Sequence, residues 1–297
     1  MPGILYLCGT PIGNLEDISL RALRTLREVD LIAAEDTRRT SRLTQHYQIA
    51  TPVTSYHQHN ERTRGPELIS QLQAGKSVAL VTDAGLPGIS DPGQILVQLA
   101  LGAGLTVVPI PGPTAALTAL VASGAPGDRF VFEGFLPRRG RARKARLAEM
   151  VAERRTVILY EAPHRLLQTL GDLAQALPER PITVARELTK HFEEFLPGVA
   201  SELLAHFRLN APRGEFTLVL HSTAPTDPDR GKRGISEALA EHLEEVERLR
   251  RGGASLKDAV QEVSTRTGLP RRQLYQAAAR AAGVNETGGA PDECPRG

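Results

Sequence analysis

The sequence predicts an α/β protein with two consecutive α/β domains, followed by a small all-α domain. Short runs rich in Val, Ile and Leu alternate with helical patterns over residues 4–221, which is typical of sheets whose strands are joined by helices. The alternation pauses at the Gly- and Pro-containing segment 123–128, and only helical patterns follow residue 234. These observations predict domains over 1–125 and 126–222, a linker over 223–234, a helical domain over 235–283 and a disordered tail over 284–297.

The first domain is predicted to contain a parallel sheet. Its strands are expected at 4–8, 31–35, 52–56, 77–83 and 106–110. The first helical pattern between them, 18–29, has Asp17 as its expected N-cap. Loops that follow the strands of an open parallel sheet gather at one edge, where ligands bind. All of these loops are polar or rich in Gly and Pro, and together they predict a ligand site: 9–14, 36–40, 57–61, 83–93 and 111–115.

The second domain has strand patterns of its own, at 129–135, 156–162, 182–189, 193–198 and 214–221. Helices are expected at 139–153 and 163–176. Only one short helix, 200–207, separates the last two strands, which predicts a mixed sheet.

The C-terminal region is predicted to form helices at 235–251 and 255–282. The second segment is interrupted by "TGLP" at 267–270, a spacing that matches a helix-turn-helix. A plain helical hairpin or a dimer contact explains the pattern equally well. The balance of five Lys and Arg against two acidic residues over 254–283 favours contact with nucleic acid.

Composition excludes several classes of protein. The chain of 297 residues is 41% hydrophobic and 24% charged, as expected for a folded globular protein. No apolar run approaches the ~18 residues of a membrane span and no signal-peptide pattern is present, so we expect a cytoplasmic protein without a membrane partner. Two cysteines cannot form a disulfide framework.

The net charge is only +2, but residues 138–155 hold eight Lys and Arg against two Glu. This local excess fits either a solvated helix face or a patch that contacts phosphates.

The common nucleotide-binding motifs are absent. No G-x-G-x-x-G follows the first strand, and "GKS" at 75–77 precedes a strand, whereas a phosphate-binding loop follows one. The loop "DAGLPGISDPG" (83–93) therefore matches neither motif; its prolines make the main chain rigid, and Asp91, which precedes Pro92, is expected to cap the next helix. His57 and His59 alternate along an extended segment, but no third ligand stands near them and no metal is expected. Substrate contacts, or capping of the next helix by Asn60, are the alternatives.

Several segments together carry a resemblance to a known family. They are "TPIGN" (10–14), "AEDTR" (34–38), "HNE" (59–61), "DAGLPGISDPG" (83–93), "PGPTA" (111–115), "YEAPHR" (160–165), "ARELTK" (185–190) and "RGE" (213–215). In this order they resemble the tetrapyrrole methylases, or class III methyltransferases, and in particular their ribosomal RNA branch. The resemblance implies a homodimer that holds S-adenosylmethionine in a cleft between the two α/β domains. It also implies 2′-O-methylation of a cytidine ribose in the decoding region of 16S ribosomal RNA within the small ribosomal subunit.

The resemblance also implies a set of cofactor-binding residues, which lie in two loops of the first domain and at two strand ends of the second. They are Asp83, Ala84, Gly85, Pro87, Ile89, Ser90, Pro111, Gly112, Pro113, Thr114, Tyr160, Glu161, Ala185 and Arg186. One departure from the family is Leu86, which stands where relatives often carry a small hydroxyl residue.

Methyl transfer to a hydroxyl depends mainly on alignment, to which a general base can add about 10²–10⁴-fold. Four side chains in the polar loops are candidates for that base: His57, Glu61, Glu187 and Lys190. Other residues of the loops and of the basic run are expected to bind the RNA: Thr10, Pro11, Gly13, Asn14, Asp36, Arg38, Arg39, His59, Asn60, Arg138, Arg139, Arg141 and Arg143.

Two other functions stay open from the sequence. A methyltransferase for tetrapyrroles would share the cofactor and the fold, and a non-catalytic ribosome-assembly factor would keep the fold for binding alone. The basic run and the added helical domain favour RNA over a tetrapyrrole. The complete set of cofactor loops argues against a factor without catalytic activity.

Overall fold

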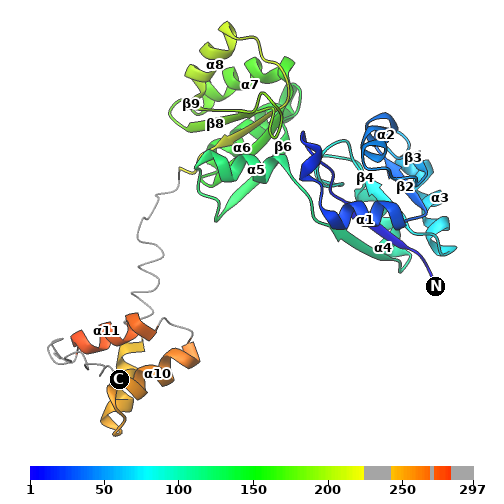
Figure 1. Cartoon of the computed structure of the whole chain (residues 1–297). Coiled ribbons are helices and arrows are strands. Elements are labelled where there is room, and N and C mark those ends of the chain that lie inside the picture. The colour runs from blue at the N-terminus through cyan, green and yellow to red at the C-terminus, as the bar shows by residue number, and fades with distance from the viewer. Residues whose placement is uncertain (224–241, 268–270, 282–297) are drawn as a thin grey trace, which may run out of the picture. The chain divides into compact units, whose positions relative to one another are not determined.

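The computed structural model describes residues 1–223, 242–267 and 271–281, and the chain divides into two compact units, Met1–Ala224 and Pro225–Gly297 (Figure 1). The first unit contains two five-stranded sheets. The second unit is helical within its described residues. The predicted linker from residue 224 on, the start of the helix expected at 235–251, most of the "TGLP" break and the predicted tail lie outside the described residues.

The first sheet is parallel throughout, with strand order β3-β2-β4-β1-β5. Its strands are β1 (Ile4–Cys8), β2 (Leu31–Ala34), β3 (Val53–Ser55), β4 (Val78–Val81) and β5 (Thr106–Ile110). The short apolar runs thus form the predicted strands, and β4 and β1 lie next to each other inside the sheet. The loops that follow these two strands are therefore neighbours at one edge of the sheet.

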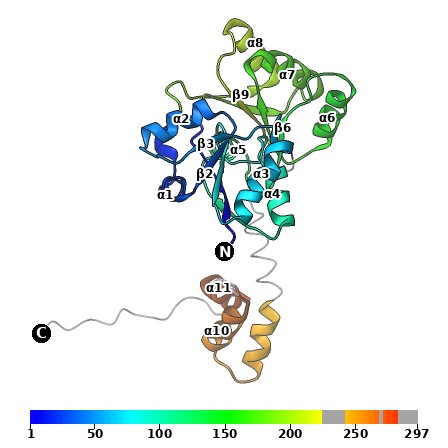
Figure 2. The ribbon, with the colours of Figure 1, turned by 90° about the vertical axis from the view of Figure 1, so that its right-hand side faces the viewer.

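Two pairs of helices cover the two faces of the first sheet (Figure 2). The pairs are α1 (Leu20–Glu28) with α2 (Thr37–His46), and α3 (Glu61–Gln73) with α4 (Gln94–Gly102). α1 buries Ala22, Leu23 and Leu26, a spacing that places them on one helical face against the sheet. The N-cap prediction for this helix is wrong: the Ser19 side chain accepts a hydrogen bond from Ala22 N, while Asp17 ends a preceding 3₁₀ turn, Leu15–Asp17.

The second sheet is mixed, as its strand spacing predicted, with the order β6-β7-β10-β8-β9. Its strands are β6 (Phe130–Phe135), β7 (Thr156–Glu161), β8 (Pro181–Arg186), β9 (Glu194–Val199) and β10 (Phe216–Leu220). β6 and β7 are parallel, whereas β10 runs antiparallel between β7 and β8. One face packs against α6 (Gly140–Ala152), α7 (Pro163–Ala176) and α8 (Ala200–Leu209).

The other face of the second sheet is covered by α5 (Ala115–Ser123), a helix that follows the last strand of the first sheet. Ala116, Ala119 and Leu120 of α5 pack in one core cluster with Ile158 and Val219 of the second sheet. By packing, α5 therefore belongs with the second sheet, and the division expected after residue 125 falls before the helix. We call β1–β5 with α1–α4 the first lobe, and α5 through β10 the second lobe.

The basic helix α6 turns one of its arginines inward. Arg143 is 4% exposed. Its guanidinium donates to Asp172 Oδ2 at 2.7 Å, to Thr169 Oγ1 at 2.9 Å and to the Pro137 carbonyl at 3.1 Å. The expectation that Arg143 contacts RNA is therefore wrong, because all three donor groups are used inside the second lobe. The nearby Arg138, Arg139 and Arg141 are exposed.

The described helices of the second unit are residues 242–251, α10 (Leu256–Thr267) and α11 (Arg271–Ala281). They share a small apolar core that includes Val246, Val260, Val263 and Leu274. No helix within the described residues is long and apolar enough to cross a membrane.

Replacing Arg143 by Ala should destabilise the first unit by about 2–4 kcal/mol, because it leaves the partly buried Asp172 carboxylate without its cation and removes the hydrogen bonds to Thr169 and to the Pro137 carbonyl. Urea unfolding followed by circular dichroism measures the shift in midpoint. The matched control is Arg141→Ala on the exposed side of the same helix, which should change stability by less than about 0.5 kcal/mol. Equal shifts for both variants would show that Arg143 makes no special contribution.

Candidate functional site

The loops that follow β1 and β4 are tied together above the first sheet. Thr10 N donates to Gly85 O at 2.9 Å, and Gly85 N donates to Thr10 O at 3.1 Å. The Thr10 hydroxyl donates to the Thr82 carbonyl at 3.1 Å. The irregular loop 83–93 is therefore fixed by main-chain contacts to its neighbour, and it forms a rigid wall.

A second close approach of main chain joins the β1 loop to the loop after β5. A Cβ atom on Gly9 would lie 2.7 Å from the Cα of Gly112, and a Cβ on Gly112 would lie 2.8 Å from the Cα of Gly9. No side chain fits at either position. The segment Pro111–Pro113 is thus pressed against residue 9, which brings Thr114 to the same wall.

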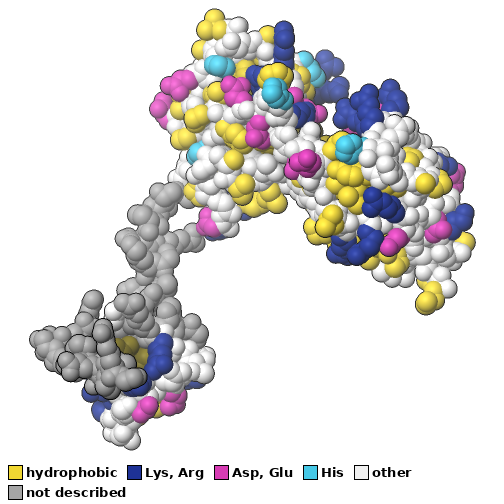
Figure 3. All heavy atoms as spheres, viewed as in Figure 1, with side chains coloured by type: hydrophobic (Ala, Val, Ile, Leu, Met, Phe, Trp, Pro, Cys, Tyr) yellow, Lys and Arg dark blue, Asp and Glu magenta, His cyan; other side chains and the backbone are white. Residues whose placement is uncertain are grey.

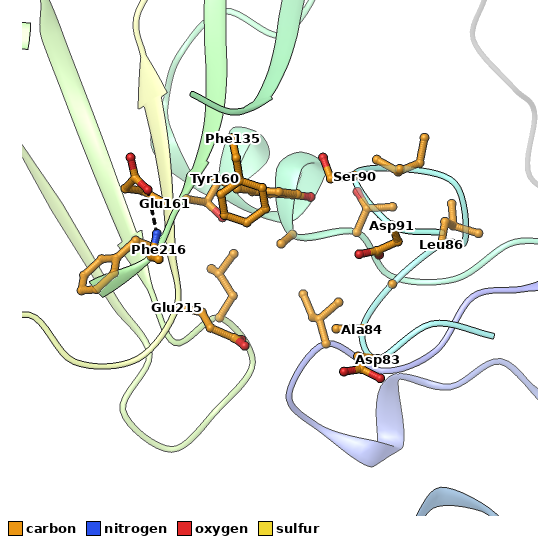
Figure 4. A pocket seen from close by; sticks show the side chains of 18 of the residues that line it. Asp83, Ala84, Leu86, Ser90, Asp91, Phe135, Tyr160, Glu161, Glu215 and Phe216 are labelled. Carbon is orange, nitrogen blue, oxygen red and sulfur yellow. Dashed lines mark hydrogen bonds between the residues drawn. The ribbon is translucent and has the colours of Figure 1, made fainter. Parts of the chain in front are cut away.

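A cavity of about 510 Å³ lies between this wall and the second lobe; we call it the first cavity (Figure 4). Its walls are largely apolar, with a few polar groups, as is usual for sites of small ligands. It is lined by Ile12, Glu35, Arg39, Asp83, Ala84, Gly85, Leu86, Ile89, Ser90, Asp91, Thr114, Ala115, Phe135, Tyr160, Glu161, Ala162, Pro163, His164, Leu188, Glu215, Phe216 and Thr217.

Three carboxyl groups of the first lobe gather on one side of the first cavity: Glu35, Asp83 and Asp91. Burial and the nearby Glu35 raise the pKa of Asp91 to about 7, and burial raises the pKa of Glu35. Arg39 is the cation of this group, with its Nε 3.4 Å from Asp83 Oδ2. The expectation that Asp91 caps the next helix is wrong, because α4 begins two residues after Pro92 with Gly93 at its N-cap position.

The opposite side of the first cavity comes from β6, β7 and the start of α7. Tyr160 points across the cavity toward Ser90 and Asp91 (Figure 4). The Tyr160 hydroxyl accepts a hydrogen bond from Ala116 N at 3.2 Å, and the Phe135 ring packs edge-on at 5.6 Å between centroids. The Glu161 carboxylate is buried and accepts from Thr169 Oγ1 at 2.5 Å, so this carboxylate stabilises the wall itself.

A second cavity, of about 400 Å³, lies beside the first. The two share Ile12, Arg39, Asp83, Ala84 and Glu215, which we call the shared wall. Cations line the second cavity, namely Arg39 and Arg42 of α2 and Lys190 of the second lobe. Lys and Arg side chains gather on the surface over α2 (Figure 3). The remaining residues that line the second cavity are Thr10, Pro11, Gly13, Leu15, Thr40, Leu43 and Thr82.

The two lobes touch where the β1 loop meets the loop after β8. A Cβ atom on Gly13 would lie 2.6 Å from the Leu188 carbonyl oxygen and 2.6 Å from Lys190 Cγ. Beyond this contact, Lys190 Nζ lies 2.9 Å from Glu187 Oε1 and 3.0 Å from Glu215 Oε2. Glu187 Oε1 also accepts from Glu215 N at 3.0 Å, which joins the loop to the start of β10.

The electrostatics of this network bear on the search for a general base. Burial disfavours the charge on Lys190, but its hydrogen bonds to Glu187 and Glu215 prevail and raise its pKa. Burial acts to raise the pKa of Glu187, yet the hydrogen bonds from Lys190 and Glu215 N outweigh it and lower that pKa. Lys190 is thus held as a cation and Glu187 as a weakly basic carboxylate, which makes both poor proton acceptors.

The structure brings most of the predicted cofactor residues to the first cavity. Those that line it are Asp83, Ala84, Gly85, Ile89, Ser90, Thr114, Tyr160 and Glu161. Pro87, Pro111, Gly112 and Pro113 are not among the lining residues, and Ala185 is buried in the core cluster beneath α5. The Arg186 guanidinium lies 3.3 Å from Glu194 in an ion pair along the β8–β9 edge.

The predicted substrate residues separate into groups. Thr10, Pro11 and Gly13 line the second cavity, whereas Asn14 accepts a hydrogen bond from Glu16 N and caps the short turn after it. Asp36 and Arg38 form an ion pair at 2.7 Å on the surface of α2.

His57, His59, Asn60 and Glu61 line neither cavity. Asn60 Oδ1 accepts from His57 N at 2.8 Å, and the two rings of His57 and His59 lie 6.0 Å apart. Asn60 makes no side-chain hydrogen bond that caps α3. Residues 57–60 thus form a turn that leads into the helix. The structure does not bring His57 and Glu61 together with Glu187 and Lys190.

Within the described residues, no group of three or more His, Cys, Asp or Glu side chains is arranged to hold a metal ion.

Several residues that line the cavities were not predicted from the sequence. Glu35 and Glu215 lie in "AEDTR" and "RGE", two segments that were recognised without assigning a role to these carboxylates. Phe135, His164, Leu188 and Phe216 stand at or near the ends of the predicted strands of the second domain. A search of the strand ends of the second domain, as was done for the first, could have found these four residues.

Comparison with known proteins assigns both units. Residues 4–204 match the family model of the Tetrapyrrole (Corrin/Porphyrin) Methylases, and residues 237–282 match the model described as the RsmI C-terminal HTH domain.

Solved structures agree with the fold. The crystal structure of diphthine synthase covers 74% of this chain and 90% of its own, with a TM-score of 0.60 and 14% identity. Uroporphyrin-III C-methyl transferase from Thermus thermophilus, solved in complex with S-adenosyl homocysteine, covers 73% of this chain and 97% of its own, with a TM-score of 0.53 and 19% identity. At these identities the likeness establishes the fold alone.

Curated relatives are much more similar in sequence. The ribosomal RNA small subunit methyltransferase I of Synechocystis is 52% identical over 92% of this chain and 96% of its own length. The Bacillus subtilis protein of the same name is 46% identical over 93% of this chain and 94% of its own length. The protein of that name from Thermotoga maritima is 49% identical over 73% of this chain and 98% of its own length. The chain therefore belongs to the tetrapyrrole methylases and, within them, to the ribosomal RNA small subunit methyltransferase I family.

Proposed function

We propose that this protein transfers a methyl group from S-adenosylmethionine to the 2′-hydroxyl of a cytidine ribose in 16S ribosomal RNA. Membership of the family supports methylation of small-subunit ribosomal RNA with this cofactor. The single observation that carries the proposal at the site is the pair of adjoining cavities, the first acidic and largely apolar, the second basic. A cationic methyl donor and an anionic nucleotide require complementary neighbours of this kind. A tetrapyrrole substrate is disfavoured, because the named relatives at 43–52% identity act on RNA by their names.

S-adenosylmethionine fits the first cavity by its chemistry. The cofactor carries no phosphate, and the loops 9–14 and 83–93 offer main chain held close by glycines in place of a phosphate cradle. Its sulfonium and amino groups are cations, for which Glu35, Asp83 and Asp91 provide a matching negative side. Its adenine ring is flat and aromatic, and the Tyr160 and Phe135 rings provide an aromatic wall for its face. When bound, the cofactor supplies the activated methyl group.

Contacts with RNA are proposed to come from three surfaces. Arg138, Arg139 and Arg141 are exposed at the start of α6, and Arg38, Arg39 and Arg42 lie along α2 beside the second cavity. The helical second unit is the third surface.

The Thermotoga maritima relative is spanned almost completely by a match of 218 residues, about the length of the first unit alone. We infer that the first unit performs the transfer and that the second unit adds affinity for the ribosomal subunit. We further propose that the protein acts in the cytoplasm as a homodimer on assembled small subunits.

The proposed reaction is tested by incubating the protein with methyl-labelled S-adenosylmethionine and small ribosomal subunits that lack the modification. The label should enter 16S ribosomal RNA and co-migrate with 2′-O-methylcytidine after digestion to nucleosides. Label on a base, or on another nucleoside, would contradict the ribose assignment. Tight cofactor binding without any transfer would favour the assembly factor.

The acidic side of the first cavity predicts a pH dependence of cofactor binding. Asp91 has a raised pKa of about 7, so its charge is absent at acidic pH and appears as the pH rises. Because a cationic ligand stabilises the charged form, the Kd for S-adenosylmethionine should fall by about tenfold from pH 5.5 to pH 7.0. Titration calorimetry at both values measures this change. The Asp91→Asn variant should bind more weakly at pH 7.0 and lose most of the pH dependence; an unchanged dependence would place the cofactor's cations elsewhere.

The basic surface of α6 predicts a salt-dependent affinity for RNA. Replacing Arg138, Arg139 and Arg141 by Ala should weaken binding to small subunits and reduce the slope of log K against log salt by about 2 to 3, one counterion for each lost phosphate contact. The charge-matched control replaces Arg24, Lys76 and Arg208, which are exposed elsewhere on the first unit. Filter binding across a series of salt concentrations gives both slopes. If the two triple variants behave alike, α6 presents only a solvated face.

A further inference from the structure

We propose that the second cavity receives the target nucleotide and that Glu215, on the shared wall, accepts the proton of the hydroxyl that is methylated. This inference rests on the proposed function and adds to it the chamber for the acceptor and the general base. It assigns a catalytic role to a residue outside the four base candidates that the sequence had suggested.

The second cavity has the size and lining that a nucleotide requires. Its volume of about 400 Å³ lies within the range of about 300–1,000 Å³ that is common for sites of small ligands. Arg39, Arg42 and Lys190 offer cations to a phosphate, and the raised pKa of Lys190 keeps its charge. The hydroxyl groups of Thr10 and Thr40 add polar partners. A chamber of this kind can hold the nucleotide by its phosphate and ribose and so align the ribose hydroxyl with the methyl donor.

If the donor occupies the first cavity and the nucleotide the second, the reacting atoms meet at the shared wall, which consists of Ile12, Arg39, Asp83, Ala84 and Glu215. Ile12 and Ala84 are apolar, and the Arg39 guanidinium is always protonated. Of the described residues common to both cavities, this leaves Asp83 and Glu215 as groups that can accept a proton.

The hydrogen bonds of these two carboxylates differ. Asp83 Oδ1 accepts from Asp36 N at 3.0 Å, and Asp83 Oδ2 faces Arg39 at 3.4 Å, so both oxygens are engaged within the first lobe. Glu215 Oε2 accepts a hydrogen bond from Lys190 Nζ at 3.0 Å. No hydrogen bond from the described residues reaches Glu215 Oε1. Glu215 also belongs to the second lobe and reaches the shared wall from the side opposite Asp83 (Figure 4).

The surrounding network fixes the position of Glu215. Its backbone N–H donates to Glu187 Oε1 at 3.0 Å, and its carbonyl accepts from Glu187 N at 3.0 Å. Glu187 thus holds the main chain at the start of β10, and Lys190 holds one carboxylate oxygen. Both act as positioning residues, and the second oxygen of Glu215 stays available for the substrate hydroxyl.

The transfer balances with this assignment. The ribose oxygen forms a bond to the methyl carbon, the carbon–sulfur bond breaks, and its electron pair stays on sulfur to give a neutral thioether. The hydroxyl proton passes to Glu215 Oε1 and from there to solvent, which reaches the exposed Glu215 side chain.

The test compares Glu215→Gln with the wild type in single-turnover methylation of small subunits. Gln keeps an oxygen for Lys190 but cannot take a proton, so the rate should fall by about 10²-fold or more, while the Kd values for S-adenosylmethionine and for the subunit stay within about twofold. The control is Glu179→Gln, an exposed carboxylate of the same lobe that lines neither cavity.

A rate for Glu215→Gln within about threefold of the wild type overturns the assignment of the base. So does a loss of rate that a weakened cofactor Kd accounts for. Failure of the proposed function looks different, because the wild type itself would then place no methyl group on a ribose. The wild-type product therefore tests the function, and the ratio of the two rates tests Glu215.

Discussion

The close contact at Gly13 sets the spacing between the two lobes on which both cavities depend. Main chain from the first lobe approaches the segment 188–190 of the second lobe so closely that no side chain can stand between them. The facing loop accepts backbone strain, since Glu187 and Thr189 have φ angles of 51° and 65°. Such conformations cost about 1–3 kcal/mol each and persist only where the surroundings hold them. Here the hydrogen bonds of Glu187 with Glu215, and of Thr189 N with Glu193, hold the loop.

Charge is divided between the two cavities in a way that suits a transfer between ligands of opposite sign. Carboxyl groups of the first lobe face the first cavity, and cations of both lobes face the second. Arg39 and Asp83 belong to both cavities and neutralise each other in part across the shared wall. Because opposite charges attract and like charges repel, each cavity complements a ligand of one sign.

Much of the fold could be predicted from the sequence, because β-rich runs and helical periodicity report directly on strands and helices. The loops at the edge of the first sheet followed from topology, since every parallel strand ends on the same side. Side-chain direction within a basic run was harder to predict. Arg143 lies on the same helical face as Leu147 and Met150, at spacings of four and seven residues, and this face is buried. That spacing was the available signal, but the density of charge around it favoured the surface.

Other features could not be predicted because they depend on contacts between distant segments. Asp91 precedes a proline near a helix start, which predicts a cap, yet the helix begins later and the carboxyl lines a cavity. His57 and Glu61 stand in a segment typical of the family, but a turn built by Asn60 keeps them away from both cavities. Glu215 gains its significance from Lys190, 25 residues earlier, and no local pattern reveals that pairing.

The packing of α5 also determines how the protein can be divided. The helix follows the first sheet in the chain, but its apolar face belongs to the core of the second. A chimaera joined at the Gly- and Pro-rich segment after α5 would pair that face with a foreign sheet and leave Val219 and Ile158 without their partners. Exchange of lobes between family members, in evolution or in the laboratory, would therefore keep α5 with its own second sheet by joining the chains ahead of it, next to Thr114, which lines the first cavity. A division of the chain that respects this packing thus passes beside the first cavity, whose lining comes from both lobes.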